Sequence, residues 1–190
     1  MTNDLNTWEA QWAPYDEATY AAVMAAIGPD DVVLDIGAGD LRLARRMAAV
    51  AARVIAWEIQ PDLLTENELP GNLHVVCTDA RGEPVPANVT VAVLLMRHCT
   101  HYALYTEKLR AAGCRRLITN ARWGMGVEVV DLAPGEPFDA LTVGWYACHR
   151  CGSVGFAGDD AALVSVESLD RVTEVEGCPI CMQADAAHDR

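Results

Sequence analysis

The sequence predicts an α/β fold: a mostly parallel sheet with helices on both faces, a shortened antiparallel carboxyl part, and a small β unit at the end. Apolar, β-branched runs alternate with helical patterns between residues 31 and 120, which is typical of a parallel sheet with crossover helices. Only residues 121–126 separate the next two strands, too few for a parallel crossover. Two Cys-x-x-Cys pairs then follow, at 148–151 and 178–181.

Length and composition set the broad class. At 190 residues and 52% hydrophobic, the chain is long enough to bury a core in one α/β domain, predicted over residues 1–147, with a small appendage over 148–190. The net charge of −13 disfavours non-specific binding of a polyanion. No signal-like or membrane-spanning run is apparent, so we expect a cytoplasmic protein with no membrane partner.

The first element is a helix that ends at Gly28-Pro29. Tyr20, Val23, Met24 and Ile27 have the i, i+3, i+4, i+7 spacing of one helix face, and Pro14 and Asp16 are start signals. This helix leads into a buried strand over residues 32–36.

A glycine turn follows that strand, and a helix is expected from Leu41 to Val50. A turn of this kind normally receives a dinucleotide pyrophosphate at the helix N-terminus. Here Asp35 ends the strand, and Asp40 is an acid that also suits the N-cap. Two carboxylates disfavour a phosphate and favour a cationic ligand.

The segment Asp35-Ile36-Gly37-Ala38-Gly39 resembles motif I of the class I (Rossmann-like) S-adenosylmethionine-dependent methyltransferases. The strands at 53–58 and 73–77 also run into acids, Glu58 and Asp79. The resemblance implies that Glu58 binds the ribose hydroxyls and that Asp79 contacts the adenine amino group. The alternative is that these acids are a helix cap and solvated strand ends. The residues assigned to the cofactor are Asp35, Gly37, Gly39, Asp40, Glu58, Ile59, Asp79 and Ala80.

The leader before the first helix is rich in aromatic residues. The resemblance implies that this lead-in closes over the methionine end of the cofactor, a role that suits Trp12 or Tyr15. The alternative is a hydrophobic staple that holds the leader against the domain.

The loop after the strand at 89–95 gathers reactive side chains. In the resembling family this loop lies beside the transferred methyl group, so His98, His101 and Tyr102 are the catalytic candidates. Histidine suits proton removal from an acceptor because its pKa lies near neutrality, and the alternative is a structural role. Cys99 has no partner motif for a nucleophile. The Asn/Asp-Pro-Pro-aromatic motif of many base-amine methyltransferases is absent, which disfavours a nucleobase amine as the acceptor.

The carboxyl half departs from the family pattern. A helix is predicted over 102–112 and a strand over 115–120, but the strand at 127–132 must be antiparallel for lack of a crossover helix. A further strand is expected over 140–147.

The two Cys-x-x-Cys pairs resemble the two halves of a zinc ribbon, with strands expected over 162–166 and 172–175. Four thiolates close a tetrahedral site and leave no open position, so the zinc would be structural. Disulfides or a redox pair are the alternative, which a cytoplasmic setting disfavours. His149 is interpreted as a bystander. The predicted metal ligands are Cys148, Cys151, Cys178 and Cys181.

These patterns predict an S-adenosylmethionine-dependent methyltransferase acting on a small molecule or a protein side chain. The alternatives are an RNA methyltransferase, which the charge disfavours without excluding, and a non-catalytic adenosyl-ligand-binding module. We also expect residues 123–160 to pack against the loop at 97–102, with Trp123, Trp145 or Tyr146 facing the acceptor. The alternative is a ribbon that projects outward as a partner surface or homodimer interface.

Overall fold

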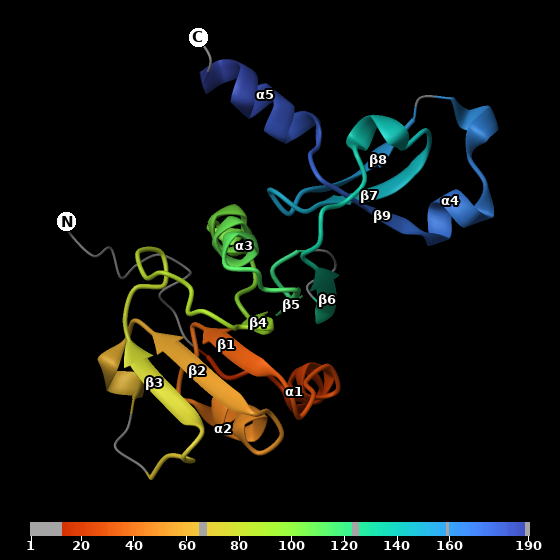
Figure 1. Ribbon diagram of the computed structural model, residues 1–190. Helices are drawn as coiled ribbons and strands as arrows, with labels where there is room; N and C mark the ends of the chain where they lie inside the picture. Colours follow the sequence, from red (N-terminus) through yellow and green to blue (C-terminus); the bar gives the residue numbers. More distant parts are fainter. Residues whose placement is uncertain (1–12, 65–67, 123–125, 159, 189–190) are drawn as a thin grey trace.

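The computed structural model describes residues 13–64, 68–122, 126–158 and 160–188, with the side chains of 184–188 excepted. It contains a six-stranded sheet, in the order β3-β2-β1-β4-β5-β6, and a separate three-stranded sheet, in the order β8-β7-β9 (Figure 1). No helix in these ranges is both long and apolar enough to cross a bilayer.

The large sheet is parallel except at one edge. Its strands are β1 (Val32–Ile36), β2 (Arg53–Glu58), β3 (Leu73–Cys77), β4 (Val91–Leu94), β5 (Arg116–Thr119) and β6 (Glu128–Asp131). β6 pairs antiparallel with β5, from Arg116↔Asp131 to Thr119↔Glu128, which confirms the antiparallel strand predicted from the short connection. The fold class predicted from the sequence is therefore confirmed.

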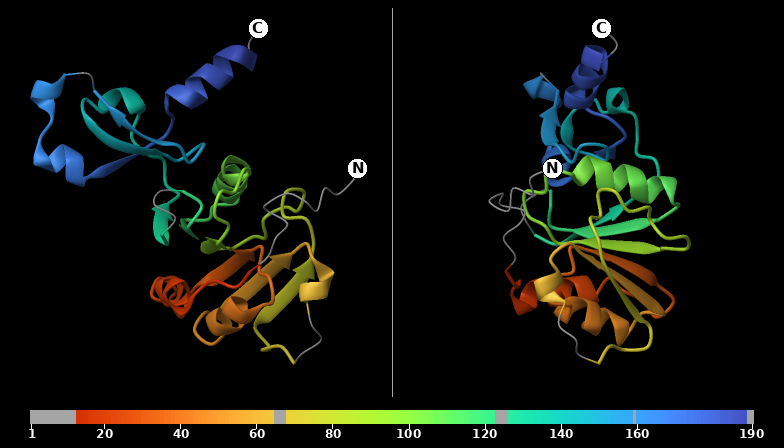
Figure 2. Two further views of the ribbon diagram at one scale, coloured as in Figure 1. Left: turned by 180° about the vertical axis from the view of Figure 1, so that it is seen from behind. Right: turned by 90° about the vertical axis from the view of Figure 1, so that its left-hand side faces the viewer.

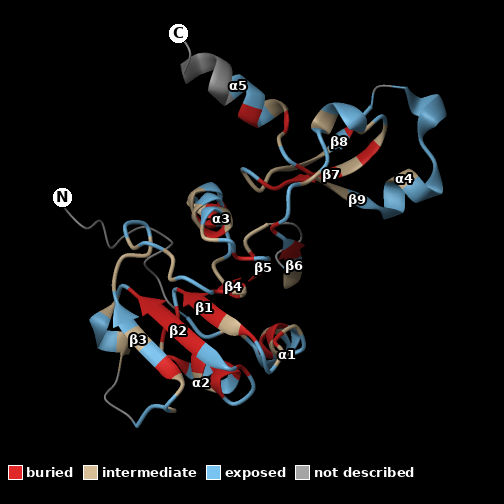
Figure 3. Ribbon diagram, in the orientation of Figure 1, coloured by how far each residue is buried: buried red, intermediate tan, exposed pale blue. Residues whose placement is uncertain are grey.

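Helices cover both faces of this sheet (Figure 2). The helices α1 (Glu17–Met24) and α2 (Arg42–Ala48) pack on one face around Val33, Val54 and Val93. Helix α3 (Tyr102–Ala111) packs on the other face through Tyr105 and Leu109. Because strand residues alternate between the two faces, the central strands β1, β2, β4 and β5 contribute to both apolar layers and are buried (Figure 3).

Helix starts follow the predicted signals only in part. Asp16 caps α1 by accepting a hydrogen bond from the Thr19 amide, as expected. The predicted cap of α2 is wrong: Leu41, with φ at 66°, occupies the N-cap position without a side-chain bond. Asp40 instead accepts from the amide and guanidinium of Arg42. Its carboxylate therefore lies beside the glycine turn and still accepts a hydrogen bond from the first amide of α2.

The smaller sheet contains β7 (Gly144–Cys148), β8 (Val154–Ala157) and β9 (Val172–Val175). The strand predicted at 162–166 is wrong, because that stretch forms a short 3-10 turn and the start of helix α4 (Val166–Asp170), which Ser165 caps. The strand at 172–175 is confirmed, and a helix α5 (Pro179–His188) begins within the second cysteine pair. The predicted division after Ala147 falls inside β7.

Candidate functional site: a carboxylate cleft and a four-cysteine cluster

A cleft of about 440 Å³ opens at the carboxyl ends of β1, β2 and β4. It lies where the strand order reverses, since β2 and β3 follow on one side of β1 and β4 on the other. Ligands of open α/β sheets bind at such a switch point, and the volume is in the range of small-molecule sites. The cleft is lined by Ala13, Pro14, Tyr15, Tyr20, Asp35, Gly37, Ala38, Asp40, Arg42, Leu43, Glu58, Ile59, Gln60, Leu95, Met96 and Arg97.

The glycine turn forms the floor of the cleft. The amides of Gly37 and Ala38 both donate to the carbonyl of Trp57, at 2.9 Å each, which fixes the turn against β2. Gly37 has φ at 76°, and a Cβ there would lie 3.1 Å from the methyl carbon of Met96. Glycine is required because the chain turns sharply and closely approaches the loop after β4.

Glu58 is held in one orientation at the end of β2. Its side chain is buried, Oε2 accepts from the Gly39 amide at 2.7 Å, and Oε1 accepts from the Gln60 amide at 2.8 Å. Each carboxylate oxygen can accept more than one hydrogen bond, so the group can still receive donors from the cleft. Two fixed amides therefore orient an acceptor pair of the kind that a ribose diol requires.

Asp35 is the carboxylate of the cleft whose charged form burial disfavours. It is only 4% exposed, and its Oδ2 has no hydrogen-bond partner among the described residues. Burial, with a smaller contribution from the charge of Glu58, raises the pKa of Asp35 to about 7. A buried carboxylate without a partner is costly, and such groups concentrate at functional sites.

The third predicted acid, Asp79, lies in the turn after β3 and does not line the cleft described above. Hydrogen bonds from the Arg81 guanidinium hold its pKa below the usual range. Ala80 is partly buried against the apolar layer under α3, whereas Ile59, at the end of β2, is exposed on the cleft. The structure thus brings Asp35, Asp40, Glu58 and Ile59 together and leaves the Asp79 turn beside them.

None of the three catalytic candidates lines the cleft. His98 is exposed with φ at 61°, and His101 is half-buried with Nδ1 3.2 Å from the Thr100 hydroxyl. Tyr102 is buried, and its hydroxyl has no partner in the described part of the chain. A Cβ on Gly152 would come within 2.8 Å of the Tyr102 ring, so this tyrosine faces the ribbon.

Tyr15 and Arg97 line the cleft instead. The Tyr15 hydroxyl donates to the carbonyl of Leu95 at 3.2 Å, and the Arg97 guanidinium lies 5.2 Å from the centre of the Tyr15 ring. Tyr15 was one of the two aromatic residues expected to cover the ligand, and Trp12 lies outside the described residues. The sequence offered no signal for the pairing of Arg97 with Tyr15, because 82 positions separate them.

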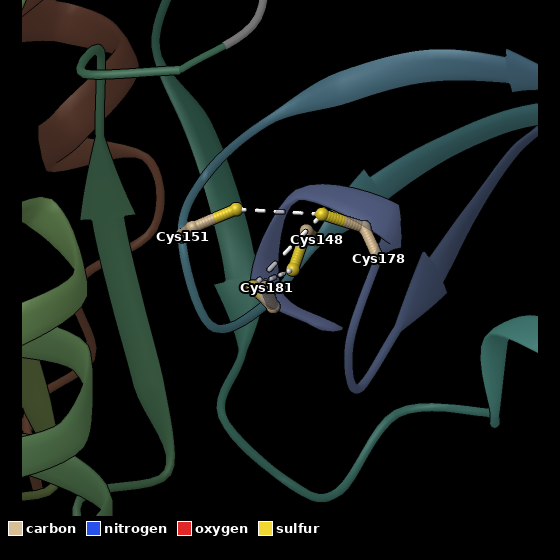
Figure 4. A group of neighbouring side chains, drawn as sticks. All are labelled: Cys148, Cys151, Cys178 and Cys181. Carbon is tan, nitrogen blue, oxygen red and sulfur yellow. Dashed lines mark hydrogen bonds between the residues drawn. The ribbon is translucent and has the colours of Figure 1, made fainter. Parts of the chain in front are cut away.

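The four cysteines of the two pairs converge on one point between β7 and α5 (Figure 4). Their sulfur atoms lie within 4.8 Å of one another, with 3.7 Å between Cys148 and Cys181 and 3.6 Å between Cys151 and Cys178. A tetrahedral zinc with 2.3 Å bonds to sulfur requires separations of about 3.8 Å. A disulfide requires about 2.05 Å, so the geometry fits a metal and not a bridge.

Buried charges join the ribbon to the sheet domain. The Arg122 side chain, 1% exposed, donates to Glu128 of β6 at 2.8 Å and to Glu174 of β9 at 2.7 Å. His149, between Cys148 and Cys151, places Nε2 3.0 Å from Glu174, and Arg110 of α3 pairs with Glu176 at 2.6 Å. The ribbon therefore packs beside α3 (Figure 1).

The aromatic residues expected to face an acceptor lie elsewhere. Trp145 packs edge to face on Phe156, and Tyr146 packs on Phe138, all within the small sheet and its lead-in. The cleft has no lining residue from the described parts of 126–188. Trp145 and Tyr146 therefore do not line this cleft, the expectation that one of them faces an acceptor stays a prediction, and Trp123 lies outside the described residues.

Comparison with known proteins gives similarity at the level of fold. No protein-family model and no curated protein matches the chain. Among solved structures, the 23S rRNA methyltransferase ErmE is similar with 23% identity and a TM-score of 0.47, over 55% of this chain and 46% of that one. Phosphoethanolamine N-methyltransferase 1 of Haemonchus contortus is similar with 18% identity and a TM-score of 0.46, over 54% of this chain and 25% of that one. An RNA methyltransferase from Salinibacter ruber is similar with 20% identity and a TM-score of 0.45, over 56% of this chain and 76% of that one. The chain spans less than half the length of the first two.

Proposed function

We propose that this chain is an S-adenosylmethionine-dependent methyltransferase that acts on a small molecule or a protein side chain and carries a structural zinc ribbon. The observation that supports it is the pair of buried carboxylates in the switch-point cleft. Glu58 is fixed by two backbone amides, and Asp35 keeps an oxygen without a partner in the described chain.

The two carboxylates suit the two ends of an adenosyl amino acid. Ribose hydroxyls donate hydrogen bonds, which the Glu58 oxygens accept, while Asp35 offers negative charge to an ammonium or sulfonium group. A dinucleotide fits poorly, because its phosphates would face Asp35, Asp40 and Glu58 in one cleft.

When bound, S-adenosylmethionine supplies a methyl group on a cationic sulfur. The protein's contribution is to fix the donor, and the acceptor must then be held in line with that methyl group. Tyr15, Met96 and Arg97 lie at the cleft and can exclude water from it. His98 and His101 stay predictions as proton acceptors, since both lie outside the cleft lining.

Binding measurements test the adenosyl site. Calorimetry should detect S-adenosylhomocysteine at micromolar concentration and no NAD. Glu58→Gln should weaken that binding about tenfold by removing a charged acceptor, whereas Glu107→Gln, an exposed acid on α3, should not. Equal binding of NAD, or an unchanged affinity in Glu58→Gln, contradicts the proposal.

Methyl transfer tests the enzymatic part. Protein incubated with methyl-labelled S-adenosylmethionine and a cell extract should label the small-molecule or the protein fraction. Label in RNA would support the RNA alternative. If the protein binds the ligand and no fraction is labelled, the chain is a non-catalytic adenosyl-binding module.

A further inference from the structure

The only lysine of the chain makes an unusual contact. Thirteen of the fourteen basic residues are arginine, and the exception is Lys108 on α3. Its Nζ donates to two consecutive carbonyl oxygens, those of Ala80 at 2.5 Å and Arg81 at 3.0 Å. A compact ammonium with three donors fits two converging carbonyls, whereas the guanidinium fork is shaped for carboxylates and phosphates.

Those carbonyls belong to a turn that is held together by its own bonds. The amides of Gly82 and Glu83 donate to the Asp79 carbonyl, at 3.0 and 3.2 Å, and the Arg81 amide donates to Asp79 Oδ1 at 3.0 Å. The Arg81 guanidinium also donates to the Asp79 carboxylate, at 2.7 Å from its terminal nitrogen. Because the turn is internally bonded, fixing two of its carbonyls restricts where the Asp79 side chain can lie.

The turn adjoins the cleft through β2 and β3. Glu58 pairs with Cys77 in the parallel register, and the Thr78 amide donates to the Glu58 carbonyl at 2.9 Å. Asp79 therefore follows directly on the strand beside the carboxylate that faces the ribose. Lys108 anchors this end of the site to α3, on the opposite face of the sheet from the α1 and α2 layer.

We propose that Lys108 is a positioning residue, which holds the Asp79 turn so that the Asp79 carboxylate accepts a hydrogen bond from the exocyclic amino group of the bound adenine. This inference rests on the proposed function, because it assumes an adenosyl ligand in the cleft. It assigns adenine selectivity to a residue on α3 that does not contact the ligand.

Two ligands that differ at position 6 of the purine, and in the N1 proton that accompanies a carbonyl there, provide the test. S-inosylhomocysteine carries a carbonyl oxygen where S-adenosylhomocysteine carries the amine. Calorimetry on the full chain should show a preference of about tenfold for the adenosyl ligand. Lys108→Met should bind the two ligands with nearly equal affinity, and Lys108→Arg should retain part of the preference for the adenosyl ligand. Glu107→Met, at the neighbouring exposed position, should retain the full preference.

Hydrogen exchange in the ligand-free protein provides a second readout. The amides of residues 81–83 should exchange faster in Lys108→Met, with an unchanged thermal midpoint. The inference is overturned if Lys108→Met retains the full preference, or if the unaltered protein binds both ligands equally. If the unaltered protein binds neither ligand, the proposed function itself fails, and the inference falls with it.

Discussion

The cleft holds a buried carboxylate and the ribbon interface a half-buried one, in opposite electrostatic settings. In the cleft, burial raises the pKa of Asp35 to about 7. At the interface, burial also acts to raise the pKa of Glu174, but hydrogen bonds from His149 and Arg122 outweigh it and lower the value to about 2. The comparison separates two settings of a carboxylate: Glu174 has its partners within the chain and joins two units, whereas Asp35 Oδ2 has no hydrogen-bond partner in the described part of the chain.

The largest effect should come from removing the metal site, which separates the ribbon from the cleft. Cys178→Ser should abolish ribbon folding, because structural zinc contributes on the order of 10 kcal/mol in small domains. Elemental analysis should give about one zinc per unaltered chain and none in the variant. Cys77→Ser, an exposed cysteine outside the cluster, is the control.

If the comparison holds, Cys178→Ser should still bind S-adenosylhomocysteine, since no described ribbon residue lines the cleft. Two results would contradict this independence of the cleft from the ribbon: metal-free protein with an intact ribbon, or loss of ligand binding in Cys178→Ser but not in Cys77→Ser.

Asp35→Asn should stabilise the protein above neutral pH. The folded state keeps the Asp35 proton up to about pH 7, whereas the unfolded chain loses it near 3.8, so stability falls as pH rises through this window. The variant should gain about 4 kcal/mol at pH 8 and only about 0.5 kcal/mol at pH 4. Denaturant unfolding at both pH values measures this, with Asp40→Asn as the control. A gain that is independent of pH would show that ionisation is not the cause.

Glu174→Gln should act in the opposite direction. A lowered folded-state pKa contributes stability at neutral pH that is lost as pH falls from about 4.5 to about 2. Because the Glu174 side chain is 35% exposed, solvent screening reduces the loss to about 2 kcal/mol at pH 7. Glu167→Gln, on the exposed ribbon helix, is the matched control. If Glu174→Gln lowered the free energy of unfolding equally at pH 2 and pH 7, the ionised Glu174 carboxylate would not be the cause of the loss.

Gly152→Ala should have the smallest effect, about 1 kcal/mol. The residue has φ at 75°, and an added Cβ would lie 2.8 Å from the Tyr102 ring. Gly177→Ala, where no atom lies within 4 Å, is the control for thermal unfolding. Equal stability of the two variants would argue against close packing of the ribbon on α3.

The sequence predicts the cleft better than it predicts the loop that follows β4. Strand ends are marked by short apolar runs that stop at an acid, so the strand pattern and the motif resemblance together place Asp35 and Glu58 at one site. The direction of a side chain in an irregular loop depends on distant partners. Tyr102 faces Gly152, fifty positions further along the chain, and no local pattern indicates that contact.

The ribbon shows the same limit. The cysteine spacing predicted the cluster, because four thiolates at one metal impose their own geometry. The stretch over 162–166 is predicted as a strand, but Asp160 and Ser165 cap short helical turns there. Local hydrogen bonds of the capping side chains override the weak strand propensity.

Proton release on ligand binding tests the central claim most directly. A cationic ligand beside Asp35 favours its ionised form, so S-adenosylmethionine should release about half a proton at pH 7, where the group is half protonated. Calorimetric titration in two buffers of different ionisation enthalpy measures this release. The account predicts micromolar binding with proton release that disappears in Asp35→Asn. Binding with the same proton balance in both proteins would contradict it.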